Sequence, residues 1–256
     1  PMMARQQALL TIKENLDTLA SSIINSIDNT RVVRSYQDKI DALRLLVERN
    51  GVQIKIELSP VLRGTVYESK LISVNEAVED EFGFAEMVVV SFADLYAGKI
   101  CAALDRQHPR DLFDIKQLLD NEGLTDELRK ALLVYIISHP RPIAELLNPH
   151  FKNISDVYRG EFINMAEYDI PQTELEAARE QLVKIINISL TREERTFLLS
   201  FKNRSPNWSL LGLSGVEQLP AILWKQQNLT KMSPDKHAYA YDRLKRVLAA
   251  KPATPV

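Results

Sequence analysis

The sequence predicts a mixed α+β fold, in which a small antiparallel or mixed sheet with helices is followed by a helical C-terminal part. Apolar residues recur at spacings of three and four over residues 1–27, which is the period of an amphipathic helix. Apolar and polar residues alternate after an Asn-Gly pair, which is typical of a β-hairpin. Beyond about residue 120 only helical patterns follow, separated by prolines. We therefore expect one domain over residues 1–120 and a second, helical one over residues 121–256.

The N-terminal elements follow from these patterns. The first helix carries an apolar stripe of Leu9, Ile12, Leu16, Leu19, Ile23 and Ile27. Two antiparallel strands are expected over residues 42–48 and 52–58, on either side of the Asn50-Gly51 turn, and Glu57 lies on the polar face of the second. A further short strand is expected over residues 86–90, where the residues are apolar and largely β-branched.

The helices that follow are marked by their ends. Ser91 and Asp94 match a capping box, which predicts a helix from that point to about Asp105. His108-Pro109 then breaks the pattern and suits the start of a second helix over residues 110–120. Further helices are expected over residues 125–138, 172–188, 191–201, 218–227 and 236–250.

The composition excludes several classes of protein. The 256 residues are 45% apolar and 26% charged, which is ordinary for a soluble globular protein. The single cysteine excludes a disulfide scaffold and indicates a reducing compartment, so we expect a cytoplasmic protein. No apolar run approaches the ~20 residues that cross a bilayer, so no membrane role is expected. No Gly-rich phosphate loop of the common kinds is present either.

Charge is distributed unevenly along the chain. The formal net charge is −2, yet residues 225–251 carry seven basic residues against two acids, a local charge of +5. This segment is either a solvated helix face or a contact for a phosphate backbone, whose affinity falls steeply with salt.

The two helices around His108-Pro109 carry the most informative charge pattern. Lys99 and Arg106 are seven residues apart and share a face of the first helix, whereas Asp111 and Asp114 share a face of the second. Two cations are therefore expected to face two carboxylates across a helical hairpin. Spacing gives proximity and not reactivity, so helix geometry alone favours a salt-bridge network that pins the helices over a catalytic site.

These residues also carry a family resemblance. The strings DLYAGK (94–99) and HPRDLFD (108–114), with Arg106 between them, resemble the signature of the AbiEii/AbiGii toxin-like nucleotidyltransferases, a bacterial group similar to the polymerase-β-like superfamily. IKIE (54–57) with PVLRG (60–64), SHPRP (138–142) and LPAILWK (219–225) resemble other segments of the family, so the resemblance spans nearly the whole chain. It implies that the small sheet is the remnant of a nucleotidyltransferase sheet.

The resemblance assigns roles to individual residues. Lys99, Asp114 and Glu57 are the expected catalytic residues, and Lys99 and Arg106 are expected to bind the nucleotide phosphates. Asp111, Arg110 and Arg63 are expected to support the site structurally. Nucleic-acid contacts are expected at Lys225, Lys231, Arg243 and Arg246.

One part of the family pattern does not occur in this sequence. The family's metal site opens with a GG-T-A-L helix start and a D-I-D strand, and residue 1 is expected to fall just beyond them. Enzymes of the superfamily hold two Mg²⁺ ions with three carboxylates, of which Glu57 is the candidate for the third. The alternative for Glu57 is an exposed strand residue beside Lys55.

The expected activity is transfer of a nucleoside monophosphate from an NTP to an acceptor, RNA or tRNA, with Mg²⁺ in the complete enzyme. The implied biology is the toxin of an AbiE-type toxin–antitoxin pair in phage defence, with an AbiEi-like antitoxin as partner. A catalytically silent, truncated binding protein that retains the helical half is the alternative. A third possibility is that another chain supplies the missing strand.

Overall fold

The structure is a computed structural model, and it describes residues 5–35, 43–58 and 64–249. The chain divides into two compact units, Pro1–Leu62 and Arg63–Val256.

The first unit is a helix on a three-stranded sheet. Helix α1 (Arg5–Ser26) precedes the strands β1 (Arg31–Arg34), β2 (Arg44–Arg49) and β3 (Val52–Glu57). The sheet is antiparallel, in the order β1-β2-β3. The predicted hairpin is confirmed: Asn50 and Gly51, with φ of 51° and 79°, form the left-handed turn between β2 and β3. Strand β1 was not predicted.

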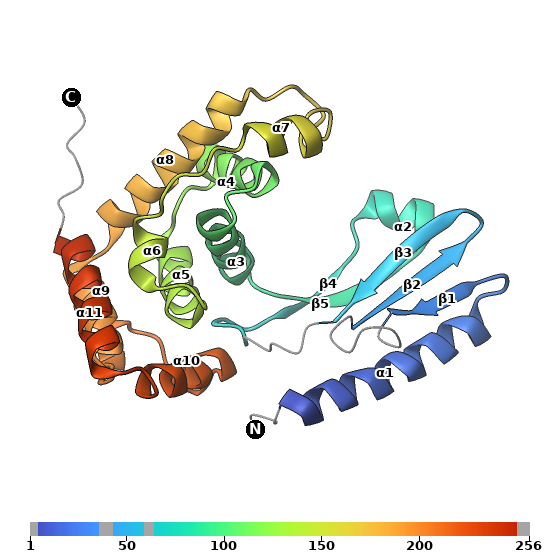
Figure 1. The fold of residues 1–256 in the computed structure, drawn as a ribbon. Helices are drawn as coiled ribbons and strands as arrows, with labels where there is room; N and C mark the ends of the chain where they lie inside the picture. Colours follow the sequence, from blue (N-terminus) through green and yellow to red (C-terminus); the bar gives the residue numbers. More distant parts are fainter. Residues whose placement is uncertain (1–4, 36–42, 59–63, 250–256) are drawn as a thin grey trace. The chain divides into compact units, whose positions relative to one another are not determined.

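Helix α1 lies along one face of this sheet (Figure 1). Leu16 and Ala20 of the helix are fully buried against Leu43 and Leu45. The helix packs on β1 and β2, so the apolar alternation of β3 is covered only in part, and Ile54 is 60% exposed.

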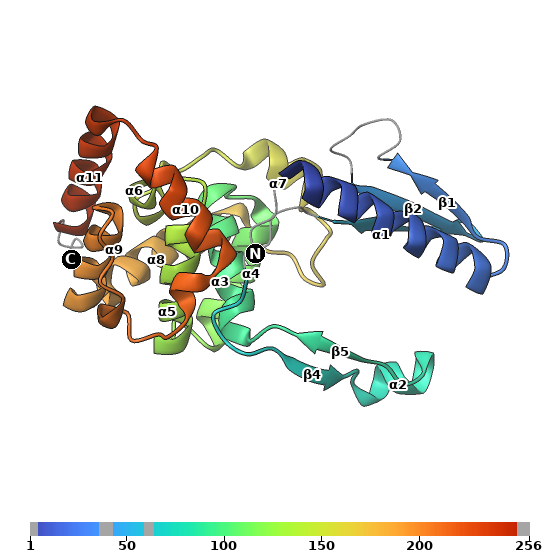
Figure 2. The same cartoon turned by 90° about the horizontal axis from the view of Figure 1, so that it is seen from below.

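The second unit begins with a two-stranded arm. Strands β4 (Lys70–Ser73) and β5 (Glu86–Val89) pair antiparallel, and the short helix α2 (Glu76–Phe82) joins them. Both strands extend away from helices α3–α11 (residues 92–249), and α2 lies at the tip of the arm (Figure 2). The arm exposes large apolar side chains, including Leu71, Ile72, Phe82, Phe84, Met87 and Val88.

The rest of this unit is helical. Its α-helices are α3 (Phe92–Asp105), α4 (Pro109–Asn121), α5 (Asp126–Ser138), α6 (Ile143–Leu147), α7 (Ser155–Glu161), α8 (Gln172–Ser189), α9 (Arg192–Lys202), α10 (Pro220–Thr230) and α11 (Pro234–Ala249). One continuous core runs through them, from Ala93 in α3 to Leu248 in α11. Helix α3 packs mainly against α5, and α4 against α8.

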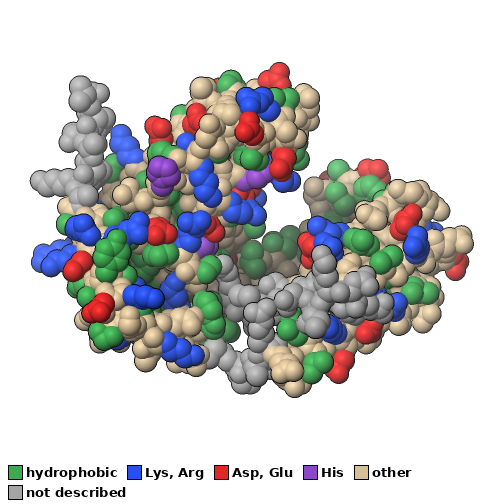
Figure 3. Space-filling model, viewed as in Figure 1, with side chains coloured by type: hydrophobic (Ala, Val, Ile, Leu, Met, Phe, Trp, Pro, Cys, Tyr) green, Lys and Arg blue, Asp and Glu red, His purple; other side chains and the backbone are tan. Residues whose placement is uncertain are grey.

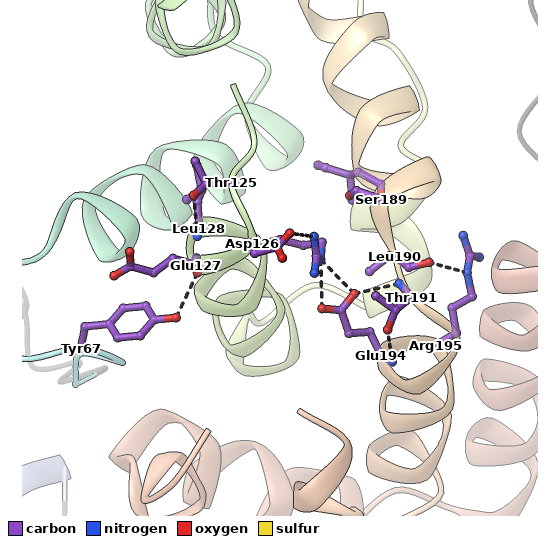
Figure 4. Close-up of polar contacts among 12 residues, drawn as sticks. Tyr67, Thr125, Asp126, Glu127, Leu128, Ser189, Leu190, Thr191, Glu194 and Arg195 are labelled. Atoms are coloured by element: carbon purple, nitrogen blue, oxygen red, sulfur yellow. Dashed lines mark hydrogen bonds and ion pairs between the residues drawn. The ribbon is translucent and has the colours of Figure 1, made fainter. Parts of the chain in front are cut away.

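A buried ion-pair network ties α5 to α9. Arg129 of α5 donates from Nε to both carboxylate oxygens of Glu194, at 3.0 Å each, and from Nη1 to Asp126 at 2.6 Å. Glu194 also closes a capping box with Thr191 at the start of α9. Figure 4 shows Asp126 and Glu194 pointing towards each other from their two helices. The network therefore uses one carboxylate both to cap a helix and to pair a buried cation.

The α+β fold class with a helical C-terminal part is confirmed. The predicted long helices are present, with ends that differ by a few residues, and the short helices α6 and α7 were not predicted. The boundary between the compact units lies at residues 62 and 63, because α3 and α4 share a single core with the later helices. The division at residue 120 into a nucleotidyltransferase-like and a helical domain stays a prediction.

Candidate functional site

The helical hairpin of α3 and α4 positions the candidate site. His108 caps α4 through Nδ1, which accepts from the N–H of Arg110 at 3.2 Å, and Pro109 occupies the first turn. Gln107, at the turn itself, has a φ of 55°, which side-chain-bearing residues rarely adopt. The turn is short, and the two helices therefore present their charged faces to each other.

Lys99 and Asp114 meet across this hairpin. The lysine Nζ donates to Oδ2 of the aspartate at 2.5 Å. The two side chains are 34% and 36% exposed, so solvent and solutes reach both. The structure thus brings together a cation and a carboxylate that the sequence spacing placed on facing surfaces.

A second pair lies nearer the turn. Arg106 makes a two-point contact with Asp111, at 3.1 Å from Nε and 2.6 Å from Nη2. The carboxylate is 11% exposed and the guanidinium side chain is 65% exposed. Asp111 therefore fixes Arg106 while leaving much of its surface open.

Helix α7 supplies a carboxylate to the other side of the turn. Glu161 lies 3.1 Å from Nε2 of His108 and 3.5 Å from a guanidinium nitrogen of Arg110. Arg110 is 56% exposed, so its expected supporting role involves a surface contact. Arg63, the other expected supporting residue, lies outside the described residues.

Glu57 lies in the first unit, at the end of β3. Its carboxylate is 3.2 Å from Nζ of Lys55 and 3.8 Å from a guanidinium nitrogen of Arg44, and its side chain is 53% exposed. Within the described residues no group of three or more His, Cys, Asp or Glu side chains is placed to hold a metal ion. Among the residues that the structure describes, Glu57 is thus a single carboxylate with two cationic neighbours, which does not fit Mg²⁺ because this ion needs several oxygen ligands.

Asp94 is a residue that the sequence reasoning assigned incompletely. Ser91 caps α3 as predicted, and the Asp94 carboxylate accepts from the Ser91 hydroxyl at 2.8 Å. The same carboxylate also accepts from the N–H groups of Val66 at 2.7 Å and Tyr67 at 3.0 Å, and from the hydroxyl of Tyr135 at 3.1 Å. This residue is 1% exposed, and its carboxylate anchors the segment that follows residue 63 onto α3. Only the tertiary fold brings these donors to it.

The basic C-terminal residues have different surroundings. Lys225 donates to the backbone carbonyls of His139 and Arg141, and burial, with a smaller effect of the Lys202 charge, lowers its pKa to about 8. Arg243 pairs with Glu145 at 2.7 Å. Lys231 and Arg246 are exposed. Lys and Arg side chains are interspersed with Asp and Glu over the face drawn in Figure 3.

A family model described as "Nucleotidyl transferase AbiEii toxin, Type IV TA system" matches residues 3–188, which include the hairpin with Lys99 and Asp114. No curated protein and no solved structure matches the chain. None of the described helices is long and apolar enough to cross a membrane.

Proposed function

Because this chain belongs to the AbiEii family of nucleotidyl transferase toxins of type IV toxin–antitoxin systems, we propose that it transfers a nucleoside monophosphate from an NTP to an RNA acceptor. The observation that carries this proposal is the Lys99–Asp114 pair, which is solvent-accessible on the α3–α4 hairpin. A solvated pair of this kind can exchange its partner for a phosphate at little cost, whereas a buried pair cannot.

The proposed roles follow from the geometry. Lys99 is a point charge that binds the triphosphate, and Asp114 holds its ammonium in place before the substrate arrives. Arg106, fixed by Asp111, offers its open edge to a second phosphate group. As a hydroxyl oxygen of the acceptor bonds to the α-phosphorus, its proton passes to water and the bond from phosphorus to the pyrophosphate oxygen breaks. These cations stabilise the charge that grows on pyrophosphate.

The acceptor is proposed to be RNA, with tRNA as the leading candidate. Its support is the exposed basic surface of the C-terminal segment, on which Lys231 and Arg246 face solvent. A type IV toxin implies an antitoxin, which we propose to be AbiEi-like and to restrain the enzyme until phage infection.

A second candidate function is a catalytically silent binding protein. It is favoured by the surroundings of Glu57, whose carboxylate faces Lys55 and Arg44 rather than other carboxylates among the described residues. A silent protein would still bind polyphosphate or RNA but would transfer nothing.

The deciding experiment incubates the full-length gene product, read from its own start codon, with each α-labelled NTP and total RNA in the presence of Mg²⁺. Label in RNA of tRNA size, with stoichiometric pyrophosphate, supports the enzyme. Binding of RNA without any transferred label supports the silent protein. Transfer that persists at full rate when Lys99 is replaced by alanine would overturn the proposed site.

A further inference from the structure

Arg179, on α8, is a buried cation that the proposed reaction does not use. The residue is 5% exposed, and its Nη1 donates to Oε1 of Gln107 at 3.0 Å and to the backbone oxygen of Lys152 at 2.9 Å. The guanidinium lies over the ring of Phe151, 4.5 Å from its centroid. Within the described part of the chain its Nε has no hydrogen-bond partner, and no carboxylate forms an ion pair with it.

This arrangement is costly for a structural role alone. Burial lowers the pKa of Arg179, although the Glu176 and Glu180 charges oppose the shift, and a guanidinium nevertheless stays charged at neutral pH. Its acceptors are two neutral oxygens, so the positive charge is offset by the nearby Glu176 and Glu180 charges but, among the described residues, not by a direct ion pair. Arg129, the other buried arginine described above, pairs with two carboxylates instead. A neutral side chain could fill the position of Arg179 without this desolvation cost.

The guanidinium of Arg179 contacts the turn of the α3–α4 hairpin through Gln107. Gln107, which follows Arg106, uses its whole amide there: Nε2 donates to the oxygen of His150 at 2.9 Å, and Oε1 also accepts from the N–H of Lys152 at 3.0 Å. The ammonium of Lys152 donates to the last carbonyls of α3, those of Asp105 and Arg106. Arg179 therefore holds the left-handed Gln107 and, through it, the end of the helix that carries Lys99 and Arg106.

An additional positive charge strengthens the attraction of the hairpin for an anion. Lys99 is balanced by Asp114 and Arg106 by Asp111, so the two pairs together carry no net charge. Lys99 lies about 10 Å along α3 from Arg106, which directly precedes the Gln107 that Arg179 contacts. Over distances of this size, salt screens the buried charge of Arg179 less than it screens an exposed charge.

We propose that Arg179 is a positioning residue for the polyphosphate-binding cations, and that its buried charge, which no carboxylate of the described residues pairs directly, raises their affinity for polyphosphate anions. The inference rests on the proposed function of the hairpin. It concerns both the charge of Arg179 and its hydrogen bonds. A carboxylate that replaces a neutral hydrogen-bond acceptor of the guanidinium changes the charge while that hydrogen bond remains. Gln107→Glu provides this change, because it keeps the contact with Nη1 and neutralises the charge, and of the Gln107 contacts it loses the donation from Nε2 to the oxygen of His150.

The experiment measures the affinity of the full chain for inorganic tripolyphosphate by calorimetry at two salt concentrations. We expect Gln107→Glu and Arg179→Gln to bind about five-fold more weakly than the wild type, with a smaller salt dependence. Arg179→Lys, which keeps the charge, should stay within about two-fold. Gln181→Glu is the matched control: it makes the same charge change on the exposed face of the same helix and should leave the affinity unchanged.

Thermal melts verify that each variant is folded. Among the variants, Gln107→Glu neutralises the charge and retains the contact with Nη1 of Arg179. If the folded Gln107→Glu and Arg179→Gln proteins bind tripolyphosphate as tightly as the wild type, the inference about Arg179 is wrong and the proposed function stands. If Gln181→Glu weakens binding as much as they do, net charge explains the effect and the inference is also wrong. If the wild type itself does not bind tripolyphosphate, the proposed function fails and the inference fails with it.

Discussion

Two ion-pair networks of this protein differ in what surrounds them. Lys99 and Asp114 join α3 to α4 with about a third of each side chain exposed, whereas Arg129 and Glu194 join α5 to α9 with side chains 11% and 4% exposed. Both link neighbouring helices by short contacts. The difference lies in solvent access, which decides whether a pair can exchange its partner for a ligand or serves only to hold helices together.

The energetic consequence of losing one partner differs accordingly. Water solvates the remaining charge of an exposed pair, so the fold loses little. In a buried pair the remaining charge has no such compensation, and stability falls by several kcal/mol. Substitutions in the two networks should therefore affect different measurements, and the four predictions below test this from the largest expected effect to the smallest.

Lys99→Ala should lower nucleotidyl transfer by the full-length protein by about 100-fold or more, because it removes the cation proposed to stabilise the leaving pyrophosphate. The melting temperature should change little, since the pair is exposed. Initial rates with labelled NTP and thermal melts measure the two effects.

Lys116→Ala is the control for this prediction. Lys116 also pairs across a helix surface, with Asp120 at 2.7 Å and Glu174 at 3.5 Å, and these contacts raise its pKa. It should transfer nucleotide at the wild-type rate. Equal losses in both variants would show that the Lys99 pair is only a structural contact.

In contrast to Lys99→Ala, Glu194→Gln should lower the stability of the fold and leave nucleotidyl transfer unchanged. It leaves the buried Arg129 without its main counter-charge and removes the carboxylate of the capping box, so the free energy of unfolding should fall by about 3 kcal/mol. Urea unfolding at pH 7 measures this loss, and transfer per folded molecule should be unchanged. A stability within about 0.5 kcal/mol of the wild type would contradict the buried character of the network.

Lys225 tests the intermediate case, a largely buried cation whose described acceptors are backbone carbonyls. The pKa of Lys225 falls from its ordinary value of 10.5 to about 8 in the folded protein. Between those pH values the unfolded chain holds a proton that the folded chain has released, so the free energy of unfolding rises with pH, by about 3 kcal/mol over the window. Lys225→Met should remove this rise in unfolding curves recorded from pH 7.5 to 10.5. A rise of the same size in both proteins would assign it to other groups.

The smallest effects are expected on RNA binding, when exposed basic residues of the C-terminal segment are replaced. Lys231→Gln combined with Arg246→Gln should weaken RNA binding a few-fold and reduce the salt dependence by about two counterions. Arg243→Gln should change the salt dependence less, because Glu145 already engages that guanidinium. Filter binding across a salt series distinguishes them, and identical slopes for wild type and double variant would argue against a phosphate contact.

Local patterns predicted much of this fold. The Asn50-Gly51 turn, the Ser91 cap and the His108-Pro109 break each act within a few residues, and the structure confirms all three. Strand β4 and helix α2 were missed because their apolar residues stay exposed and follow no burial pattern.

The candidate site was predictable to a similar degree. The facing pairs of Lys99 with Asp114 and Arg106 with Asp111 follow from helical periodicity. The partners of Asp94, Lys225 and Arg179 do not, because their contacts bridge 27 to 86 residues of sequence. Such contacts depend on how the helices pack, which periodicity does not specify.

The β4–β5 arm has a consequence for solubility. Two strands that pair only with each other, among the described residues, leave an outer edge on each, and free edges with apolar side chains are templates for aggregation. Helix α2 joins the strands and concentrates four carboxylates on seven residues: Glu76, Glu79, Asp80 and Glu81. Like charges on two approaching arms repel each other, so this helix protects the exposed strands from pairing with those of another copy.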